Sequence, residues 1–195
     1  EVTSNSPQSS GNVSDSIVSP KLSFIFGPWS KTEYFINYGN GFHSNDARGT
    51  TITVDPSNTS VPVDKVNPLV RSTGGEVGVR SEIIPRVETS LSLWQLKLDS
   101  ELLFVGDAGT TEPSRPTKRT GVEWTNHYKP YSWLLVDLDL SYSRTRFTDE
   151  DLAGDYVPGS IEKVASFAVT VDSFGPWYGM LQYRYFGPRP LIEDN

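Results

Sequence analysis

Cysteine is absent from this 195-residue chain, and histidine and methionine are scarce, with two residues and one residue respectively. Without cysteine the chain has no disulfide, no thiolate chemistry and no cysteine-based zinc site. The net charge is −7, because 24 acidic residues outnumber 17 basic ones, and no basic stripe runs along the sequence. Since nucleic-acid binders neutralise phosphates with such stripes, we expect no nucleic-acid partner.

Long apolar runs are also missing, so the sequence encodes no transmembrane helix of about eighteen apolar residues. Apolar residues make up 36% of the chain and aromatic residues 12%, with abundant Thr, Val, Ser, Tyr, Gly and Pro. This balance favours an all-β chain with many turns. A β-barrel that spans a membrane would escape a hydropathy scan, because alternation of apolar and polar residues halves its mean hydropathy.

Residues 88–105 form the most regular stretch, in which apolar and polar side chains alternate. A period of two is typical of a β-strand with one apolar and one polar face. Charges of both signs occur in mid-strand, which suits the wet lumen of a membrane barrel. We therefore expect one set of side chains to face lipid and the other to face the lumen. The first set is Ser92, Trp94, Leu96, Leu98, Leu102 and Phe104, and the second is Gln95, Lys97, Asp99 and Glu101.

Shorter alternating stretches raise the number of predicted strands to about eight. Besides residues 88–105 they are 21–26, 32–42, 70–83, 122–128, 134–142, 167–171 and 181–185. Residues 1–19 are rich in Ser, Asn, Gln and Pro, which predicts a polar, flexible lead-in to a β domain at 20–195. The predicted fold class is all-β: an antiparallel up-and-down meander that is part of a transmembrane-type barrel, or closes into a small one.

The predicted connections alternate strictly between short turns and long loops. The long loops are residues 43–68, 106–118 and 148–161. Transmembrane barrels show this asymmetry, with short turns on the periplasmic side and long loops outside. A β-sandwich has no physical reason to sort its loops by length, although it can do so.

Three tryptophans, Trp29, Trp133 and Trp177, lie at or beside short turns, with Tyr131 and Tyr178 next to them. An aromatic girdle at one membrane interface would place them there. Tryptophans buried in a core near the strand ends would fit the same positions.

Side chains suited to catalysis or metal binding are few. The histidines at 43 and 127 lie on separate predicted elements, and no further His or Cys stands at ligand spacing. Asp137 and Asp139 share a strand face, where lumen charge is a simpler role than acid–base chemistry. The acidic loop at 149–155 offers oxygen ligands for Ca²⁺ but lacks the EF-hand spacing. We expect no enzyme activity, no cofactor and no resident metal.

Arginines and other polar residues gather in or beside the three long loops. The guanidinium fork binds carboxylates with two hydrogen bonds, so arginine suits anionic chelates. The ligand-contacting candidates are therefore His43, Asn45, Asp46, Arg48, Arg115, Arg119 and Arg189. The same side chains could instead tie the loops to one another, and the sequence leaves both interpretations open.

Three stretches carry a resemblance to a known family: NYGNGFHSNDARG at 37–49, LDSELLFVGDAGTTEPSRPTKRTGVEW at 98–124 and YFGPRPLIEDN at 185–195. They resemble the barrel of bacterial outer-membrane TonB-dependent receptors. The pattern G-x-G-F-x-S-N-D-x-R-G, from Gly39 to Gly49, is the most specific of them. In that family a barrel of about 22 strands encloses a plug domain.

The resemblance implies uptake of a scarce nutrient, such as an iron–siderophore chelate or cobalamin, across the outer membrane. The implied partners are outer-membrane lipid, the nutrient or metal chelate, the plug domain and TonB. The sequence shows no plug, no TonB-contacting box and no aromatic C-terminal strand, so we expect a middle-to-late part of such a barrel. Which nutrient is carried does not follow from the sequence. The alternative from another class is a secreted β-sandwich that binds carbohydrate through exposed Trp and Tyr.

Overall fold

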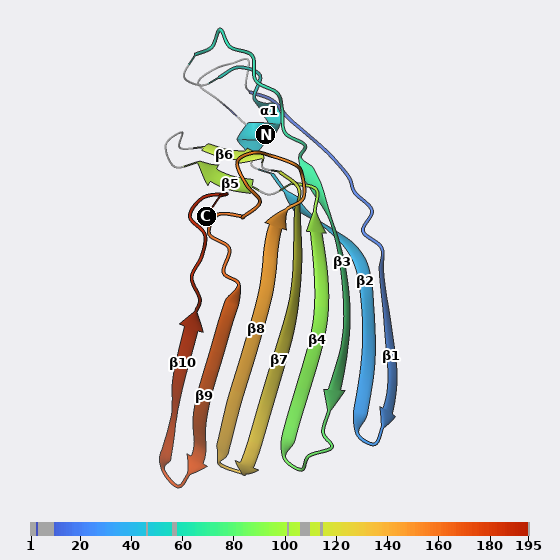
Figure 1. Cartoon of the computed structure of the whole chain (residues 1–195), viewed down its shortest axis with the longest axis vertical. Helices are drawn as coiled ribbons and strands as arrows, with labels where there is room; N and C mark the ends of the chain where they lie inside the picture. The colour runs from blue at the N-terminus through green and yellow to red at the C-terminus, as the bar shows by residue number, and fades with distance from the viewer. Residues whose placement is uncertain are drawn as a thin grey trace.

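One antiparallel sheet of eight strands dominates the structure, a computed structural model (Figure 1). The structure describes residues 3, 10–45, 47–55, 58–100, 102–105, 110–113 and 115–194, without the side chains of residues 48, 102–105 and 110–113. In sheet order the strands are β1 (Lys21–Trp29), β2 (Thr32–Ser44), β3 (Leu69–Ser81), β4 (Val87–Leu98), β7 (Thr117–Tyr131), β8 (Leu134–Phe147), β9 (Lys163–Phe174) and β10 (Trp177–Phe186). Because these eight strands cross the sheet in the same order as they occur in the chain, the predicted all-β meander is confirmed.

The two ends of the sheet differ, as Figure 1 shows. Short turns join β1 to β2, β3 to β4, β7 to β8 and β9 to β10 at one end, which we call the turn end. The long connections 45–68, 99–116 and 148–162 gather at the other end, the loop end, with the helix α1 (Ala47–Thr51). The predicted alternation of short turns and long loops is therefore confirmed. No helix among the described residues has the length and apolar character needed to cross a membrane.

The long strand predicted at residues 88–105 is in fact divided. β4 ends at Leu98, where the main chain turns away after Asp99 donates its N–H to the Arg71 carbonyl at 3.1 Å. The next residues form β5 (Leu102–Val105), which pairs with β6 (Thr110–Pro113) in a separate two-stranded sheet. The predicted loop at 106–118 thus contains one strand of this hairpin and the start of β7.

The sheet is open, with β1 at one edge and β10 at the other. All residues of these two strands are exposed, and in Figure 1 they lie on opposite sides of the sheet. Closure into a small barrel, one of the two predicted forms, is therefore wrong. The other form, part of a larger barrel, agrees with the open sheet.

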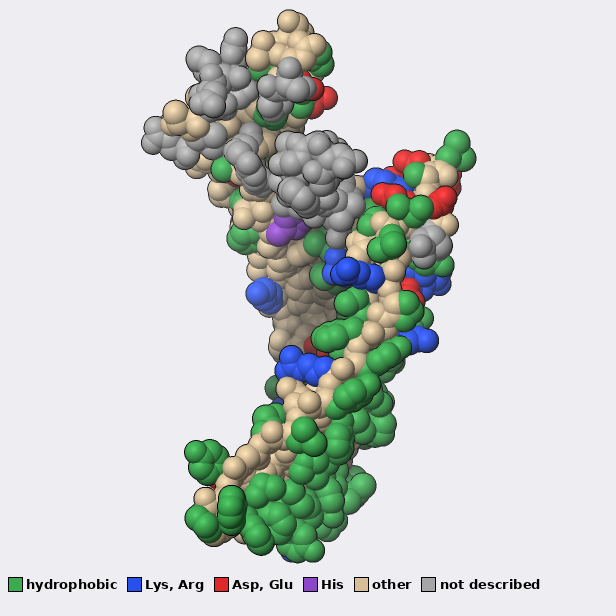
Figure 2. All heavy atoms as spheres, turned by 90° about the vertical axis from the view of Figure 1, so that its left-hand side faces the viewer, with side chains coloured by type: hydrophobic (Ala, Val, Ile, Leu, Met, Phe, Trp, Pro, Cys, Tyr) green, Lys and Arg blue, Asp and Glu red, His purple; other side chains and the backbone are tan. Residues whose placement is uncertain are grey.

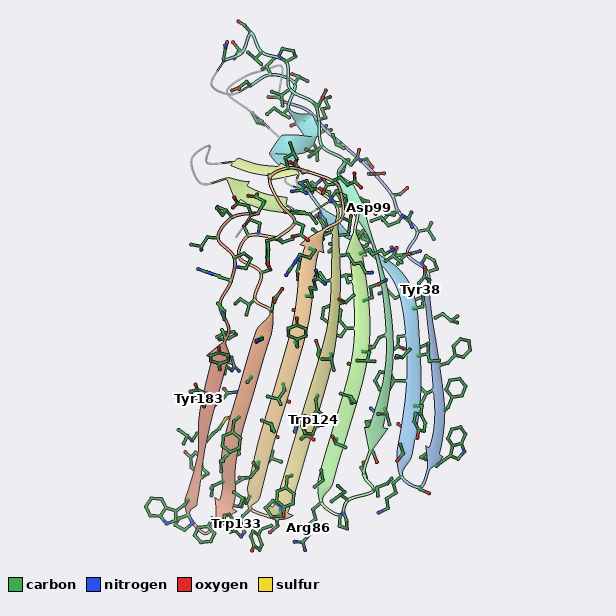
Figure 3. The ribbon with its side chains drawn as sticks, in the orientation of Figure 1. Tyr38, Arg86, Asp99, Trp124, Trp133 and Tyr183 are labelled. Carbon is green, nitrogen blue, oxygen red and sulfur yellow. The ribbon has the colours of Figure 1, made fainter. Side chains whose placement is uncertain are left out.

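Cross-strand register divides the side chains into two faces, because directly opposed residues point to the same side. One face is apolar across all eight strands and lies on the convex side of the sheet; Figure 2 shows hydrophobic side chains gathered there. Figure 3 labels three of its residues, on β2, β7 and β10. We call the following residues the apolar band: Leu22, Phe24, Phe26, Tyr34, Ile36, Tyr38, Val77, Val79, Leu91, Leu93, Val122, Trp124, Leu138, Leu140, Tyr142, Phe167, Val169, Leu181, Tyr183 and Tyr185.

The faces predicted for residues 91–99 are inverted in the structure. Leu93 lies opposite Val122 and therefore belongs to the apolar band, whereas Trp94 lies opposite Gly121 on the concave face. Every other residue follows, so Ser92, Leu96 and Leu98 are concave, and Gln95, Lys97 and Asp99 are on the convex side. The alternation was predicted correctly, but alternation alone does not tell which of the two sets of side chains lies on the convex face.

The sheet encloses almost no core of its own. Among the described residues only Val70, Phe147, Val157 and Ala168 are buried hydrophobic ones. The accessible surface is 13252 Å², whereas a compact monomer of this mass exposes roughly 9200 Å². The apolar band is therefore left uncovered within the chain, which is the opposite of a sandwich that buries its apolar faces.

Two glycines on the concave face allow aromatic rings to lie flat across the neighbouring strand. A Cβ atom on Gly78 would lie 2.2 Å from Cζ of Phe35, and one on Gly121 would lie 2.6 Å from the ring of Trp94. Real side chains do not approach this closely, so only glycine fits under each ring.

Aromatic rings cluster at the turn end of the sheet, where Figure 3 labels Trp133. The rings of Tyr131 and Trp133 are stacked with centroids 5.4 Å apart, and Phe174 lies 4.7 Å from Trp133. Trp29 contacts Tyr34 at 6.2 Å. The predicted positions beside short turns are thus confirmed, while the membrane girdle remains a prediction.

Candidate functional site

The connection between β8 and β9 is tied to Arg115, which precedes β7. The Arg115 Nε donates to both carboxylate oxygens of Asp149, at 2.7 and 2.8 Å, and its Nη1 donates to the Gly154 carbonyl at 2.8 Å. The guanidinium also lies 4.3 Å from the ring centroid of the buried Phe147. Arg115 therefore ties the loop through Nε and Nη1, whereas its buried Nη2 has no hydrogen-bond partner among the described residues.

This pairing changes the acid–base behaviour of the loop. The hydrogen bond from Arg115 lowers the pKa of the Asp149 carboxyl below its ordinary value. The same contact raises the pKa of Arg115. Each charge thus favours the ionised form of the other, and the pair persists until the pH falls through the lowered pKa of Asp149.

Arg146, at the end of β8, makes a second tie within the same loop. Its Nη1 donates to Oε1 of Glu162 at 2.6 Å, and its Nε lies 3.8 Å from Oδ2 of Asp155. Its guanidinium stacks 4.0 Å from the ring centroid of Tyr156. Both ends of the connection are therefore held by an arginine that lies against an aromatic ring.

The last described residues also pack on this loop. The Tyr156 N–H donates to the Glu193 carbonyl at 3.0 Å, and the Gly159 N–H donates to Pro190 at 2.8 Å. The chain approaches so closely that a Cβ on Gly154 would lie 2.2 Å from the Glu193 oxygen. Arg189 lies in this packed segment, with its side chain exposed.

His43 and Asn45 lie at the loop end of β2. His43 follows the concave face and is half-buried, and its Nε2 has no hydrogen-bond partner in the described part of the chain. Asn45 is buried; its Nδ2 donates to the Asn67 carbonyl at 2.6 Å, and its N–H donates to Pro68 at 2.9 Å. Asn45 therefore fastens the two ends of the connection 45–68 together, whereas His43 keeps a free ring nitrogen.

The other candidates occupy separate places. Asp46 and the side chain of Arg48 lie outside the described residues, although the Arg48 main chain is part of α1. Arg119 is half-buried on the concave face, in register with Leu96. No hydrogen bond or ion pair within the described ranges links His43, Asn45, Arg115 and Arg189 to one another. These four candidates, whose side chains are all described, are therefore not joined into one cluster by direct contacts.

Part of the charge of the acidic loop is compensated within the loop end. Asp149 and Asp155 face arginines, and Oδ1 of Asp151 accepts a hydrogen bond from the Ala153 N–H at 2.9 Å. Over the described part of the chain, no three His, Cys, Asp or Glu side chains come together as a metal site would require. The carboxylates therefore shape the loop.

Polar residues on the concave face pair across neighbouring strands. Glu33 and Arg80 form an ion pair at 2.5 Å, and Asn37 Nδ2 donates to Glu76 at 3.2 Å. On the same face, between β7 and β8, His127 Nδ1 lies 2.5 Å from Asp137. The partner of the Asp137 carboxylate thus comes from the neighbouring strand β7, and the wall on this side is hydrophilic and internally compensated.

Polar groups inside the apolar band satisfy one another. The Trp124 indole N–H donates to the Thr89 hydroxyl at 3.0 Å, which donates to Oδ1 of Asn126 at 2.7 Å. The Asn126 amide in turn donates to the Leu138 carbonyl at 3.3 Å. Each of these polar groups therefore has a hydrogen-bond partner within the band, as a surface in lipid would require.

The residues that hold the loop end together were not identified from sequence. Arg115 and Asp149 are 34 residues apart, and Arg146 and Glu162 are 16 apart. No spacing rule joins residues so distant in the chain. Of these four residues only Arg115 had been singled out from the sequence, as a ligand contact or a loop tie.

Comparison with known proteins identifies the family. The profile of the family described as "TonB dependent receptor-like, beta-barrel" matches residues 1–195. The chain therefore belongs to the TonB-dependent receptor β-barrel family, a family of bacterial outer-membrane transporters and receptors and not of enzymes. No curated protein sequence matches the chain.

Solved structures share the fold at low identity. They include the "Copper transporter OprC", with a TM-score of 0.66 and 17% identity over 90% of this chain. The FrpB iron transporter from Neisseria meningitidis (F3-3 variant) follows with 0.57 and 13% over 85%, and BauA, the ferric preacinetobactin receptor from Acinetobacter baumannii, with 0.55 and 15% over 80%. The chain spans only 27%, 26% and 23% of these three structures, so it corresponds to about a quarter of each barrel-bearing protein.

Proposed function

We propose that this chain forms part of the wall of a TonB-dependent outer-membrane receptor that imports a scarce metal or metal chelate. The observation that carries the proposal is the apolar band, which crosses all eight strands on the convex face while charged and polar residues pair on the concave face. A barrel wall has lipid on its outer side and a wet lumen inside, so it needs this asymmetry.

The dimensions of the band support the same assignment. On β8 the apolar convex side chains run from Leu134 to Tyr142, and a transmembrane β-strand needs about 9–11 residues. Aromatic rings at the turn end would then lie at the periplasmic interface, and the long loops would lie outside. The concave face would line the lumen and meet a plug domain in the complete receptor.

For the nutrient we propose only a chemical class, a metal or a metal chelate. The neighbouring structures are named as transporters or receptors for copper, iron and ferric preacinetobactin. This chain would contribute loop-end residues that face the entrance. Among the candidates, three have a buried side-chain atom without a hydrogen-bond partner in the described residues: Nε2 of His43, Oδ1 of Asn45 and Nη2 of Arg115. We propose His43 first, because Asn45 and Arg115 also use other atoms to hold their own loops. Arg119 and Arg189 remain proposals, as do Asp46 and Arg48.

A secreted carbohydrate-binding sandwich is disfavoured by the arrangement of the sheets. A sandwich packs two sheets face to face over a shared core. In the described part of the chain, the second sheet is the small β5–β6 hairpin, and the apolar band has no covering layer.

Single-cysteine labelling tests the proposal directly, since the chain has no native cysteine. Cysteines replace Leu138 and Phe167 on the convex face, and Thr125 and Ser166 on the concave face, in the complete receptor in its membrane. A spin label on the convex positions should be broadened by oxygen dissolved in lipid. A label on the concave positions should be broadened by a water-soluble nickel complex. Equal water accessibility on both faces would refute the proposed wall.

A further inference from the structure

Two neighbouring turns at the turn end of the sheet are joined to each other by hydrogen bonds. The Lys129 N–H, at the end of β7, donates to the carbonyl of Arg86 at 2.9 Å, and Nη1 of Arg86 donates to the Pro130 carbonyl. Arg86 has a φ of 67°, a conformation that a residue other than glycine keeps only where the surrounding structure holds it. Figure 3 labels both Arg86 and Trp133 at this end. The two turns therefore present one fixed surface.

A pocket of about 380 Å³ lies on this surface. Small-molecule sites have volumes of about 300–1,000 Å³, so the pocket is large enough for a small ligand. Its lining residues are Arg86, Lys129, Pro130, Tyr131, Ser132 and Trp133. These described lining residues supply cations, a hydroxyl and aromatic rings, but no Leu, Ile, Val or Met side chain that could receive an acyl chain.

The aromatic part of the pocket is a flat platform. The rings of Tyr131 and Trp133 are nearly parallel, at 4°, with centroids 5.4 Å apart, and Phe174 packs against Trp133 at 4.7 Å. Tyr131 is nevertheless 58% exposed, so these contacts orient its ring and leave it accessible. An aromatic ring with an apolar face and a polar hydroxyl suits a ligand of the same character. A pyranose sugar is such a ligand, because it has apolar C–H faces and hydroxyl groups at its edge.

The cations of the pocket lack an acidic partner. Within the described ranges neither Arg86 nor Lys129 takes part in an ion pair, and both residues are exposed. Arginine binds a carboxylate with two parallel hydrogen bonds, and lysine adds a mobile positive charge. A ligand that carries a carboxylate beside a sugar ring would therefore match both the platform and the cations.

We propose that this pocket binds a carboxylated glycan, the glycan of the bacterial cell wall, in which N-acetylmuramic acid carries a carboxylate next to its pyranose ring. Tyr131 stacks on the sugar ring, and Arg86 and Lys129 bind the carboxylate. A phospholipid fits less well, because the lining offers no place for its acyl chain, and an acidic peptide would leave the platform unused. The inference rests on the proposed function, since only a turn end that faces the periplasm meets this glycan.

Saturation-transfer difference NMR measures binding to the complete receptor in lipid nanodiscs. The probe is the disaccharide of N-acetylglucosamine and N-acetylmuramic acid, and the comparison sugar is N,N′-diacetylchitobiose, which has two similar rings and no carboxylate. The unaltered receptor should bind the probe about tenfold more tightly than chitobiose, and R86Q/K129Q should lose this preference. Tyr131→Ala should weaken the binding of both sugars by about two- to tenfold.

The single variant K129Q tests the charge without disturbing the joined turns, because Lys129 contributes only its main chain to their contact. It should bind the probe about two- to fivefold more weakly. The matched control is K31Q, which removes the same charge from the β1–β2 turn, outside the pocket. K31Q should bind the probe as the unaltered receptor does.

Three results would overturn the proposal: equal affinity of the unaltered receptor for the two sugars, equal losses in K31Q and K129Q, or no binding of the probe. Displacement of the probe by a short-chain phosphatidylglycerol or by tetraglutamate, at lower concentration than the probe itself requires, would also overturn it. The spin-label accessibility of positions 138 and 125 is measured in nanodiscs of the same composition. Failure of the glycan site with the two faces still distinct would therefore remove this inference and leave the proposed wall intact.

Discussion

The convex and concave faces of this sheet are built from the same eight strands, yet they handle polar groups in different ways. On the concave face, charges such as Glu33 and Arg80 form pairs between neighbouring strands. In the middle of the convex face, the few polar groups hydrogen-bond to one another, as Trp124 does with Thr89. The difference agrees with the proposed wall, because a face in lipid tolerates neither charges nor free hydrogen-bonding groups, whereas a face in water tolerates both.

The two ends of the convex face also differ from its middle. At the turn end the apolar band gives way to stacked aromatic rings such as Tyr131 and Trp133. At the loop end it gives way to opposed cations such as Lys97 and Lys118. Both kinds of residue are suited to the headgroup layer, aromatic rings through an apolar body with a polar tip and lysines through a long apolar stem.

The largest predicted effect comes from placing a charge on the convex face. Leu138→Arg should destabilise the receptor in bilayers by about 2–4 kcal/mol, because it puts a guanidinium near the midplane. Thr125→Arg is the control on the concave face, opposite Asp139, and should cost far less. Urea unfolding in lipid vesicles measures both values. Similar losses in the free energy of unfolding for the two variants would contradict the assignment of the convex face to lipid and the concave face to the lumen.

The next effect concerns the concave face. Gly78→Val should cost about 1–3 kcal/mol, because the new side chain would displace the Phe35 ring. Gly179→Val provides the control, since nothing lies within 4 Å of a Cβ at that strand position. The same unfolding measurement applies, and a harmless Gly78→Val would show that the ring is not held over the glycine.

A smaller effect is expected at the turn end. Trp133→Ala removes two ring contacts, and each aromatic pair contributes roughly 0.5–1.5 kcal/mol beyond the area it buries. Trp177→Ala should cost less, because Trp177 is 71% exposed. Thermal unfolding of the two variants in the same detergent compares them. A larger fall in melting temperature for Trp177→Ala than for Trp133→Ala would contradict the prediction that the aromatic cluster around Trp133 is the more stabilising one.

The smallest effect should be local and pH-dependent. Because Asp149 has a lowered pKa in the folded protein, its ion pair with Arg115 stabilises the loop above the pKa of a free aspartate. That contribution is lost as the pH falls through the lowered pKa. The hydrogen-exchange protection factors of residues 148–155, which are corrected for the intrinsic pH dependence of exchange, should fall on acidification, and Asp149→Asn should show the low values already at neutral pH. Protection factors that do not change with pH in the unaltered protein would contradict the pairing.

Much of the fold follows from the sequence, since alternation and turn residues act locally. The strands near Phe24, Ile36 and Leu138 were predicted with the correct faces. The stretch at 88–105 was predicted as one strand, because its alternation continues past the point where β4 ends. The local pattern of alternation gives no sign that the main chain leaves the sheet after Leu98.

The candidate site was less predictable, because its contacts join distant parts of the chain. Arginines at the loop end were foreseen, but the pairing of Arg115 with Asp149 and of Arg146 with Glu162 depends on how three connections meet. Asn45 was expected as either a ligand contact or a loop tie, and its side-chain amide fastens its own loop.

The sequence by itself determined an all-β chain with short turns at one end and long loops at the other, because both features depend on residues close together in the chain. Only the tertiary structure decided which side of β4 faces outward. Leu93 and Leu96 are equally apolar, and the strand continues beyond the apolar band into a region where Lys97 stands on the same side as Leu93. Pairing with Val77 and Val122 settles the matter, since opposed residues must share a face and eight strands must present one continuous apolar surface.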